Sequence, residues 1–219
     1  MHILSVGDSW SAGVWDVNNE KHNVVDKGYQ QQLNEIGTVK NIWSYNNNQA
    51  LQNLYLHHED YDVVLFFFTD PFRDITHYKR RYSFFVNDIL TAGELLSSHA
   101  ALLESTMQAL NAFGSKVKVI GGCQNLNHRD DKNIIVSCAS ELVSNNEYQH
   151  PLLWDSGWSG MINFDNCKKD LLKELDKNRQ LQDAMESQQF QKYFWPDGYH
   201  LNKHSNNILG EHLVKILTS

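Results

Sequence analysis

Residues 3–13 read ILSVGDSWSAG, and this stretch decides the fold class of the chain. Ile3 to Val6 is a short apolar run that ends at Gly7, a pattern typical of a buried strand that feeds a tight turn. Further along, Val39 to Trp43 is a second strand candidate. Asp62 to Phe68 is the strongest candidate, because it is continuously apolar and β-prone, as a strand covered on both faces should be.

The second half of the chain adds helices between further strand candidates. Apolar residues at helical spacing predict a helix over Leu95 to Phe113, with Gly114 at the position just past its end. Val117 to Ile120 predicts a fourth strand, and Asn202 caps a last helix whose apolar residues are Ile208, Leu209, Leu213, Ile216 and Leu217. Short strand-like pieces stand at Ile134–Val136 and Leu152–Trp154, and 165–190 reads as a charged, mostly exposed helix.

This alternation of strands and helices predicts an α/β fold with a mostly parallel sheet that is wrapped on both faces. The sequence has no internal repeat and no Pro/Ser-rich linker, so we expect one domain over residues 1–219.

Composition narrows the function classes. The 219 residues carry 19 Lys and Arg against 26 Asp and Glu, a net charge of −7, whereas a nucleic-acid binder usually has a basic face. No apolar run approaches the roughly 18–20 residues that span a bilayer. Asn and Gln together number 35, which in other chains signals disorder, but 11% aromatic residues supply the apolar mass of a folded chain. We therefore expect a folded domain without nucleic-acid or membrane partners.

The cysteines and the N-terminus bear on the compartment. Cys123, Cys138 and Cys167 are odd in number and lack CxxC spacing, which disfavours a disulfide framework or a thiolate zinc site. The first residues have neither a basic region nor a long apolar segment, so no secretory signal is expected. The prediction is a cytoplasmic protein with reduced thiols, and association with a virus particle stays open.

Two segments carry candidate chemistry. Asp8 and Ser9 directly follow the first strand, where the carboxyl edge of an α/β sheet binds ligands and a helix start offers backbone N–H groups to an anion. Capping of the following helix explains the same residues equally well. Near the other end, Asp197 and His200 are three residues apart, which suits a carboxylate that orients an imidazole base, although Asp-x-x-His is most often structural.

Gly7-Asp8-Ser9 after an N-terminal strand, together with Asp197-Gly198-Tyr199-His200-Leu201-Asn202 before a C-terminal helix, resembles the SGNH hydrolases, the GDSL esterase/lipase superfamily. The resemblance spans nearly the whole chain, and its specificity lies in the two motifs as a pair. It implies a flavodoxin-like three-layer α/β/α sandwich with a sheet of about five strands. It also implies Ser9 as nucleophile, His200 as general base and then acid, and Asp197 as its orienting partner.

The inner motifs depart from the family pattern. The family's oxyanion hole combines the N–H of the nucleophile, a Gly N–H and an Asn side chain. This chain has Asn46 and Asn48 where the Gly is expected, and Thr69 where the Asn is expected. Asn46 or Asn48 could supply an amide and Thr69 a hydroxyl, while the alternative is that the Asn run only forms a turn.

The segment after the third strand candidate contains two further candidate residues. Thr69-Asp70-Pro71-Phe72-Arg73 is similar to a Thr-x-Pro-x-Arg variant in SGNH-like proteins of bacteriophages. Arg73 could anchor a substrate carboxylate. The commoner alternative is a structural ion pair with Asp70 or Asp74. The His-rich segments at 57–60 and 128–131 lack the spacing of a metal site, so neither metal nor cofactor is expected.

The sequence thus predicts a serine esterase that cleaves a small acyl group. The further detail of an acetyl group on a carbohydrate rests on aromatic residues in loops, which stack on sugars in some proteins and simply cover the core in others. Two alternatives stay open: a catalytically silent SGNH scaffold used for binding or assembly, and an acyltransferase that uses the same three residues.

Overall fold

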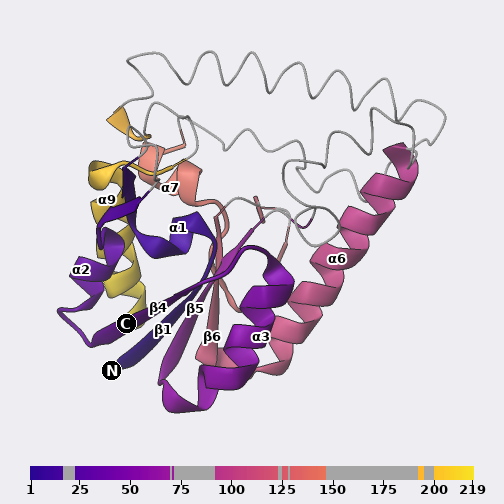
Figure 1. Cartoon of the computed structure of the whole chain (residues 1–219), viewed down its shortest axis with the longest axis horizontal. Coiled ribbons are helices and arrows are strands. Elements are labelled where there is room, and N and C mark those ends of the chain that lie inside the picture. The colour runs from indigo at the N-terminus through magenta and orange to yellow at the C-terminus, as the bar shows by residue number, and fades with distance from the viewer. Residues whose placement is uncertain are drawn as a thin grey trace.

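The computed structural model describes residues 1–16, 23–69, 71, 92–122, 125–127, 129–146, 192–194 and 200–219. Its centre is a five-stranded sheet in which every pairing is parallel, with the order β4-β1-β5-β6-β7 (Figure 1). The strands span β1 His2–Gly7, β4 Thr38–Trp43, β5 Val63–Phe68, β6 Val117–Gly121 and β7 Ile134–Val136. In chain order this arrangement is 2-1-3-4-5, the flavodoxin-like order.

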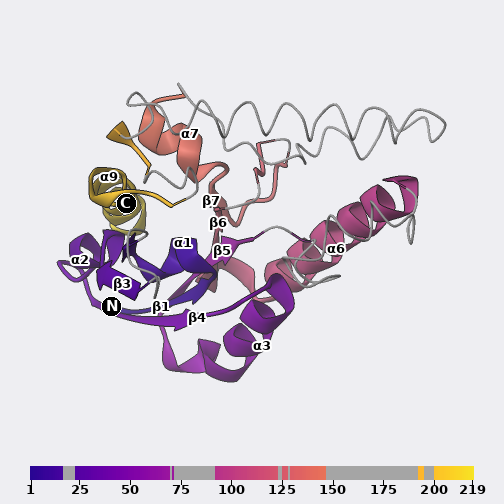
Figure 2. The ribbon, with the colours of Figure 1, turned by 45° about the horizontal axis from the view of Figure 1, so that its top comes forward.

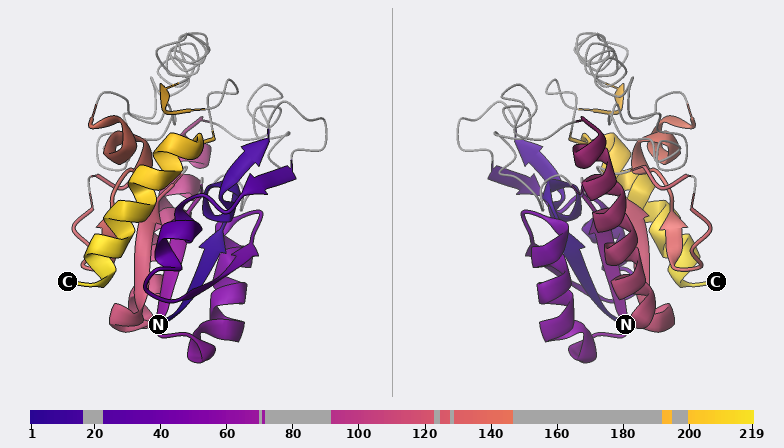
Figure 3. Two further views of the ribbon diagram at one scale, coloured as in Figure 1. Left: turned by 90° about the vertical axis from the view of Figure 1, so that its left-hand side faces the viewer. Right: turned by 90° about the vertical axis from the view of Figure 1, so that its right-hand side faces the viewer.

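Helices cover both faces of the sheet, which makes three layers (Figures 2 and 3). One face is covered by α3 (Asn47–His57) and α6 (Ala92–Ala112). The opposite face is covered by four further helices: α1 (Ser9–Ala12), α2 (Tyr29–Leu33), α7 (Ala139–Ser144) and α9 (Lys203–Leu217). The predicted α/β class, the three layers and the predominantly parallel sheet are therefore confirmed.

Alternation of side chains along each strand divides the core into two clusters. Ile3, Leu65 and Phe67 point to the face of α2 and α9, whereas Val6 and Phe66 point to that of α3 and α6. Side chains 64–68 of β5 are all fully buried, since layers of helix lie on both sides of this strand. The continuous apolar run that singled out β5 in the sequence is the direct consequence of that position.

Several elements match their sequence predictions closely. The helix expected from Leu95 begins earlier, at Ala92, and it ends at Ala112, followed by Gly114 with φ of +68°. Asn202 caps α9 by accepting a hydrogen bond from the N–H of Ser205 at 3.0 Å. The segments 152–154 and 165–190 lie outside the described residues.

Other elements were not anticipated from the sequence. A two-stranded antiparallel sheet joins β2 (Val14–Asp16) and β3 (Asn23–Asp26). Short 3-10 turns follow α3 and α6, at His58–Asp60 and Gly114–Lys116. Within the described parts of the chain, no helix is both long and apolar enough to cross a membrane.

Candidate active site

The strand order itself marks one place on the sheet for a ligand. From β1 the chain continues to β4 on one side, and it then returns through α3 to β5 on the other side of β1. In open α/β sheets ligands bind outside the carboxyl ends of the strands where the order reverses in this way. Asp8 and Ser9 follow β1 and Thr69 follows β5, so these residues lie at the switch point.

Gly7 lets the backbone turn sharply at the end of β1. Its φ is +149°, a conformation that side chains other than hydrogen disfavour. A Cβ at Gly7 would lie 2.6 Å from the Cβ and 2.8 Å from the carbonyl oxygen of Phe67, so β1 and β5 approach too closely here for any other residue. The glycine thus brings the residue after it, Asp8, up to the end of β5.

Asp8 connects the turn after β1 with the end of β5. One carboxylate oxygen accepts the backbone N–H of Trp10 at 3.0 Å, which makes Asp8 the N-cap of α1, and Ser9 is the first residue of that helix. The other carboxylate oxygen accepts the hydroxyl of Thr69 at 2.6 Å. Asp8 and Thr69 are each only 1% exposed, so this charge-assisted bond is shielded from water.

Asn47 extends this connection to the third neighbouring strand. Its Oδ1 accepts the backbone N–H of Thr69 at 3.0 Å, and its Nδ2 donates to the carbonyl oxygen of Thr69 at 2.9 Å. Asn47 is fully buried at the start of α3. The loops after β1, β4 and β5 are therefore held together by Asn47, Thr69 and Asp8, which we call the Asn47–Thr69–Asp8 bridge.

The other residues of the Asn run have different surroundings. The side chain of Asn46 accepts the N–H of Gln49 at 2.9 Å and so caps α3, while Asn48 is exposed in the first turn of that helix. Asn47, the buried member of the run, was not among the candidate residues expected from the sequence. The one feature of the sequence that could have indicated Asn47 is its place a few positions past the end of a predicted strand.

The residues that follow Ser9 and His200 are both buried on the same face of the sheet. Trp10, which follows Ser9, and Leu201, which follows His200, are members of the same buried apolar cluster. A bridge between Phe194 and Leu201 and the bond from the Asn206 amide to the Leu201 carbonyl oxygen at 3.0 Å hold the chain just after His200. Ser9 and His200 are both half-buried.

Three candidate residues lie outside the described residues: Asp70, Arg73 and Asp197. Within the described ranges, no group of three or more His, Cys, Asp or Glu side chains has the geometry to hold a metal ion. Cys138 is buried, with its sulfur 3.2 Å from the hydroxyl oxygen of Ser140.

Comparisons with known proteins give few matches. No protein-family model matches the chain, and no curated protein matches its sequence. A solved structure, the lipase Lip_vut3 from a goat rumen metagenome, aligns over 98% of this chain and 96% of its own, with 13% identity and a TM-score of 0.41. An overlap of this quality carries no argument about activity. The functional assignment therefore rests on this chain's own residues.

Proposed function

We propose that the chain is a serine esterase of the SGNH type that hydrolyses a small acyl ester. The observation that carries the proposal is the position of Ser9. It begins a helix directly after strand β1, at the switch point of the sheet. A serine at such a position can present its hydroxyl to a ligand at the carboxyl edge of the sheet.

In the proposed reaction the Ser9 hydroxyl oxygen attacks the ester carbonyl carbon while His200 accepts the hydroxyl proton. His200 then gives this proton to the leaving alkoxide, which departs as an alcohol and leaves an acyl group on Ser9. Water, deprotonated by His200, attacks the acyl-enzyme and releases the acid. Asp197 orients the imidazole. The negative oxygen formed in each step is stabilised by the backbone N–H of Ser9 and an amide of Asn46 or Asn48.

In this proposal Thr69 is a positioning residue and does not act as an oxyanion donor. Its hydroxyl proton is donated to the carboxylate of Asp8, 2.6 Å away. Thr69 thereby stabilises the turn that carries Ser9 and does not contact the substrate.

The test combines turnover of p-nitrophenyl acetate with labelling by a fluorophosphonate probe, which reacts with activated serines. The wild type should turn over the ester and be labelled at Ser9. Ser9→Ala should lose both, with turnover down about 10³-fold or more. Ser105→Ala is the control and should keep full turnover and labelling, because Ser105 is an exposed serine on α6 whose hydroxyl donates to the Leu102 carbonyl oxygen of the same helix. Full activity in Ser9→Ala would rule out the proposed nucleophile.

A second candidate function, a silent SGNH scaffold used for binding or assembly, is favoured by the engagement of the inner polar groups. The hydroxyl of Thr69 and the side-chain oxygen of Asn46 both serve structural hydrogen bonds. A wild-type protein that is folded but neither labelled nor active would support this candidate. The acyltransferase alternative is separated by product analysis with an acceptor sugar, because an acylated acceptor then replaces free acid.

A further inference from the structure

An aromatic pair stands beside the proposed site without being part of the machinery described above. Trp43 is the last residue of β4, and its side chain is 49% exposed. The ring centroid of Tyr45 lies 6.4 Å from that of Trp43, with an interplanar angle of 65°, so the two rings meet edge to face. A half-exposed tryptophan that is fixed by a second ring presents a flat apolar surface to solvent.

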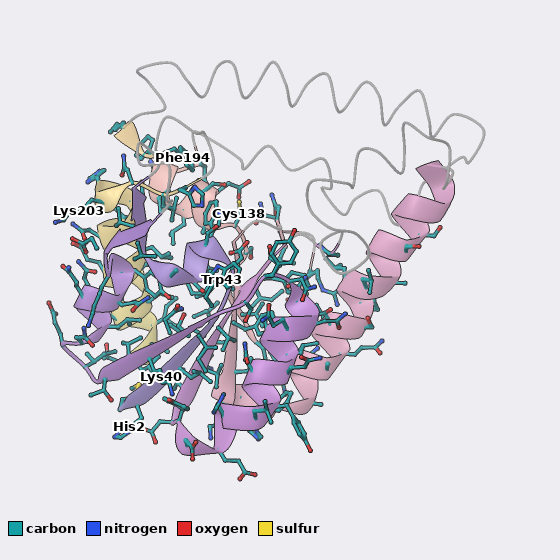
Figure 4. All side chains as sticks on the ribbon, viewed as in Figure 1. His2, Lys40, Trp43, Cys138, Phe194 and Lys203 are labelled. Atoms are coloured by element: carbon teal, nitrogen blue, oxygen red, sulfur yellow. The ribbon has the colours of Figure 1, made fainter. Side chains whose placement is uncertain are left out.

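The strand register fixes where this surface lies. Trp43 is paired with Gly7 in the parallel ladder, and the N–H of Ser44 donates to the Gly7 carbonyl oxygen at 2.6 Å. Trp43 therefore lies across the ladder from the residue two positions before Ser9. Figure 4 labels Trp43 near the upper end of β4, close to the start of α3.

The side chain of Trp43 is on the face of the sheet that carries α1. Its neighbour Ile42 packs against the cluster on the opposite face, and side chains alternate along a strand. Asn41, two residues before Trp43, donates to the carbonyl oxygen of Ser11 in α1 at 2.7 Å. Trp43 and the helix that begins with Ser9 thus share one face at the carboxyl edge.

The residues that follow Trp43 in the chain are neutral and polar. Residues 44–49 read SYNNNQ, a segment with neither a charged nor an aliphatic side chain. A long acyl chain would be expected to meet aliphatic residues, and an anionic substrate to meet cations. An exposed aromatic plane that is followed in the chain by exposed amides, Asn48 and Gln49, suits a sugar ring, whose C–H groups pack on the plane while its hydroxyls form hydrogen bonds with polar groups.

We propose that Trp43 and Tyr45 form a carbohydrate subsite, and that the ester cleaved at Ser9 is an acyl group on a sugar hydroxyl. The assignment rests on the proposed function for the position of the scissile bond, but the subsite itself is independent of turnover. Trp43 stacks on the ring of the acylated sugar, while the acyl carbonyl reaches Ser9.

The first experiment measures binding without turnover. In Ser9→Ala, saturation-transfer NMR with an O-acetylated methyl xyloside should show transfer to the ring C–H protons. Adding Trp43→Ala should weaken the affinity about 10-fold, and Trp43→Phe should recover part of it. Tyr55→Ala is the matched control, because Tyr55 is 72% exposed in the last turn of α3, away from the helix start that adjoins the site.

The second experiment measures selectivity in the active protein. We expect Trp43→Ala to lower the ratio of kcat/KM for the acetylated xyloside to kcat/KM for ethyl acetate about 10-fold, mainly through KM for the sugar. Tyr55→Ala should leave this ratio unchanged.

Several results would overturn the subsite. Equal losses for the xyloside and ethyl acetate in Trp43→Ala would mean that Trp43 only supports the fold of the turn. An equal dependence of cyclohexyl acetate on Trp43 would mean an apolar platform without preference for sugars. A dimer that dissociates in Trp43→Ala would assign the surface to a second copy. By contrast, Trp43-dependent sugar binding in a protein without esterase turnover would retain the subsite and remove the proposed function.

Discussion

The two faces of the sheet are built from different interactions. On the face of α3 and α6, the buried cluster contains Leu54, Phe66 and Met107, and the buried hydrogen bonds of Asn47 lie at the start of α3. On the face of α1, α2 and α9, buried hydrogen bonds add to the apolar packing. Three donors converge there on the carbonyl oxygen of Ser11: the Tyr29 hydroxyl at 2.6 Å, the Gln30 amide at 3.0 Å and the Asn41 amide at 2.7 Å.

Apolar packing and hydrogen bonds contribute differently to the stability of the protein and to the positioning of the candidate residues. Apolar burial stabilises without strong direction, whereas a hydrogen bond fixes distance and angle. The carbonyl oxygen of Ser11 belongs to the short helix α1, whose carbonyl groups have few partners inside the helix. The hydrogen-bonded face is the one that carries Ser9. We infer that these directed hydrogen bonds hold the proposed nucleophile in place, while apolar burial on both faces supplies most of the folding free energy.

Removing apolar volume from the α3 face should give the largest change in stability. Leu54→Ala should lower the free energy of unfolding by about 3–4 kcal/mol, because Leu54 is fully buried and the cavity adds to the lost transfer energy. Leu56→Ala, at a 69% exposed position on the same helix, should stay within about 0.5 kcal/mol. Urea titration measures both variants. A loss of labelling at Ser9 in folded Leu54→Ala would contradict the division of roles.

Breaking the Asn47–Thr69–Asp8 bridge should act on turnover. Thr69→Val removes the hydroxyl that donates to Asp8, and we expect kcat to fall about 10–100-fold, in line with the ~1.5–3 kcal/mol of a hydrogen bond to a charged group. Thr69→Ser retains the donor and should recover most of the rate.

A double-mutant cycle separates positioning from direct contact. If Thr69 acts through Asp8, Thr69→Val should cause no further loss of kcat in an Asp8→Ala background. Additive losses would mean instead that the Thr69 hydroxyl contacts the oxyanion.

Removing the Tyr29 hydroxyl should have a smaller effect on the position of α1 than breaking the Asn47–Thr69–Asp8 bridge. It donates to the Ser11 carbonyl oxygen and lies 2.6 Å from the Ser5 hydroxyl oxygen, so the Ser5 proton is directed to Tyr29. Burial raises the pKa of Tyr29, which keeps the donor proton in place.

Tyr29→Phe should lower the free energy of unfolding by about 1–2 kcal/mol and also slow the fluorophosphonate labelling of Ser9. Ser5→Ala, which leaves the bond to Ser11 intact, should slow labelling less. An unchanged labelling rate in Tyr29→Phe would indicate that α1 does not depend on this hydrogen bond for its position.

The smallest expected effect is a pH dependence from Asp26. The backbone N–H of Gly28 holds the pKa of Asp26 below its ordinary value by donating to the carboxylate. The Lys203 ammonium, whose Nζ lies 3.1 Å from Asp26 Oδ2, lowers this pKa further. A lowered folded pKa stabilises the protein above the unfolded value near 3.8, and this stabilisation is lost as the pH falls through the folded pKa. Lys203→Gln should therefore reduce the fall in Tm between pH 5 and pH 3. An identical fall in both proteins would exclude a contribution from the pair.

Much of the sheet was predictable because buried parallel strands are marked by local composition. The continuous apolar run of β5 is enough to identify it as a buried strand, and α9 is recognisable from its cap and its apolar spacing, which also involve only neighbouring residues. The helix α3 was missed because its first turn is Asn-Asn-Gln, a composition typical of turns. The structure explains the contradiction, since Asn46 is the cap and Asn47 forms its side-chain bonds with Thr69.

The candidate site was predictable only where its residues follow a strand directly. Gly7, Asp8 and Ser9 could be placed at a strand-to-helix turn from neighbouring residues alone. The bond between Asp8 and Thr69 joins residues 61 positions apart, and it depends on β1 and β5 being neighbours and on the close approach at Gly7. Trp43, the residue of the proposed subsite, could not be identified from the sequence either, because its exposure depends on the strand order. As a strand residue it reads as core, and its exposure follows from its place at the end of an edge strand.

The direction of α9 has a practical consequence for how the protein is handled. The helix starts near the carboxyl edge of the sheet, which carries the candidate site, and it runs back so that both chain ends lie toward the opposite edge (Figures 1 and 3). A tag or a solid support attached at either end would therefore be placed away from the edge of the sheet that carries the candidate site.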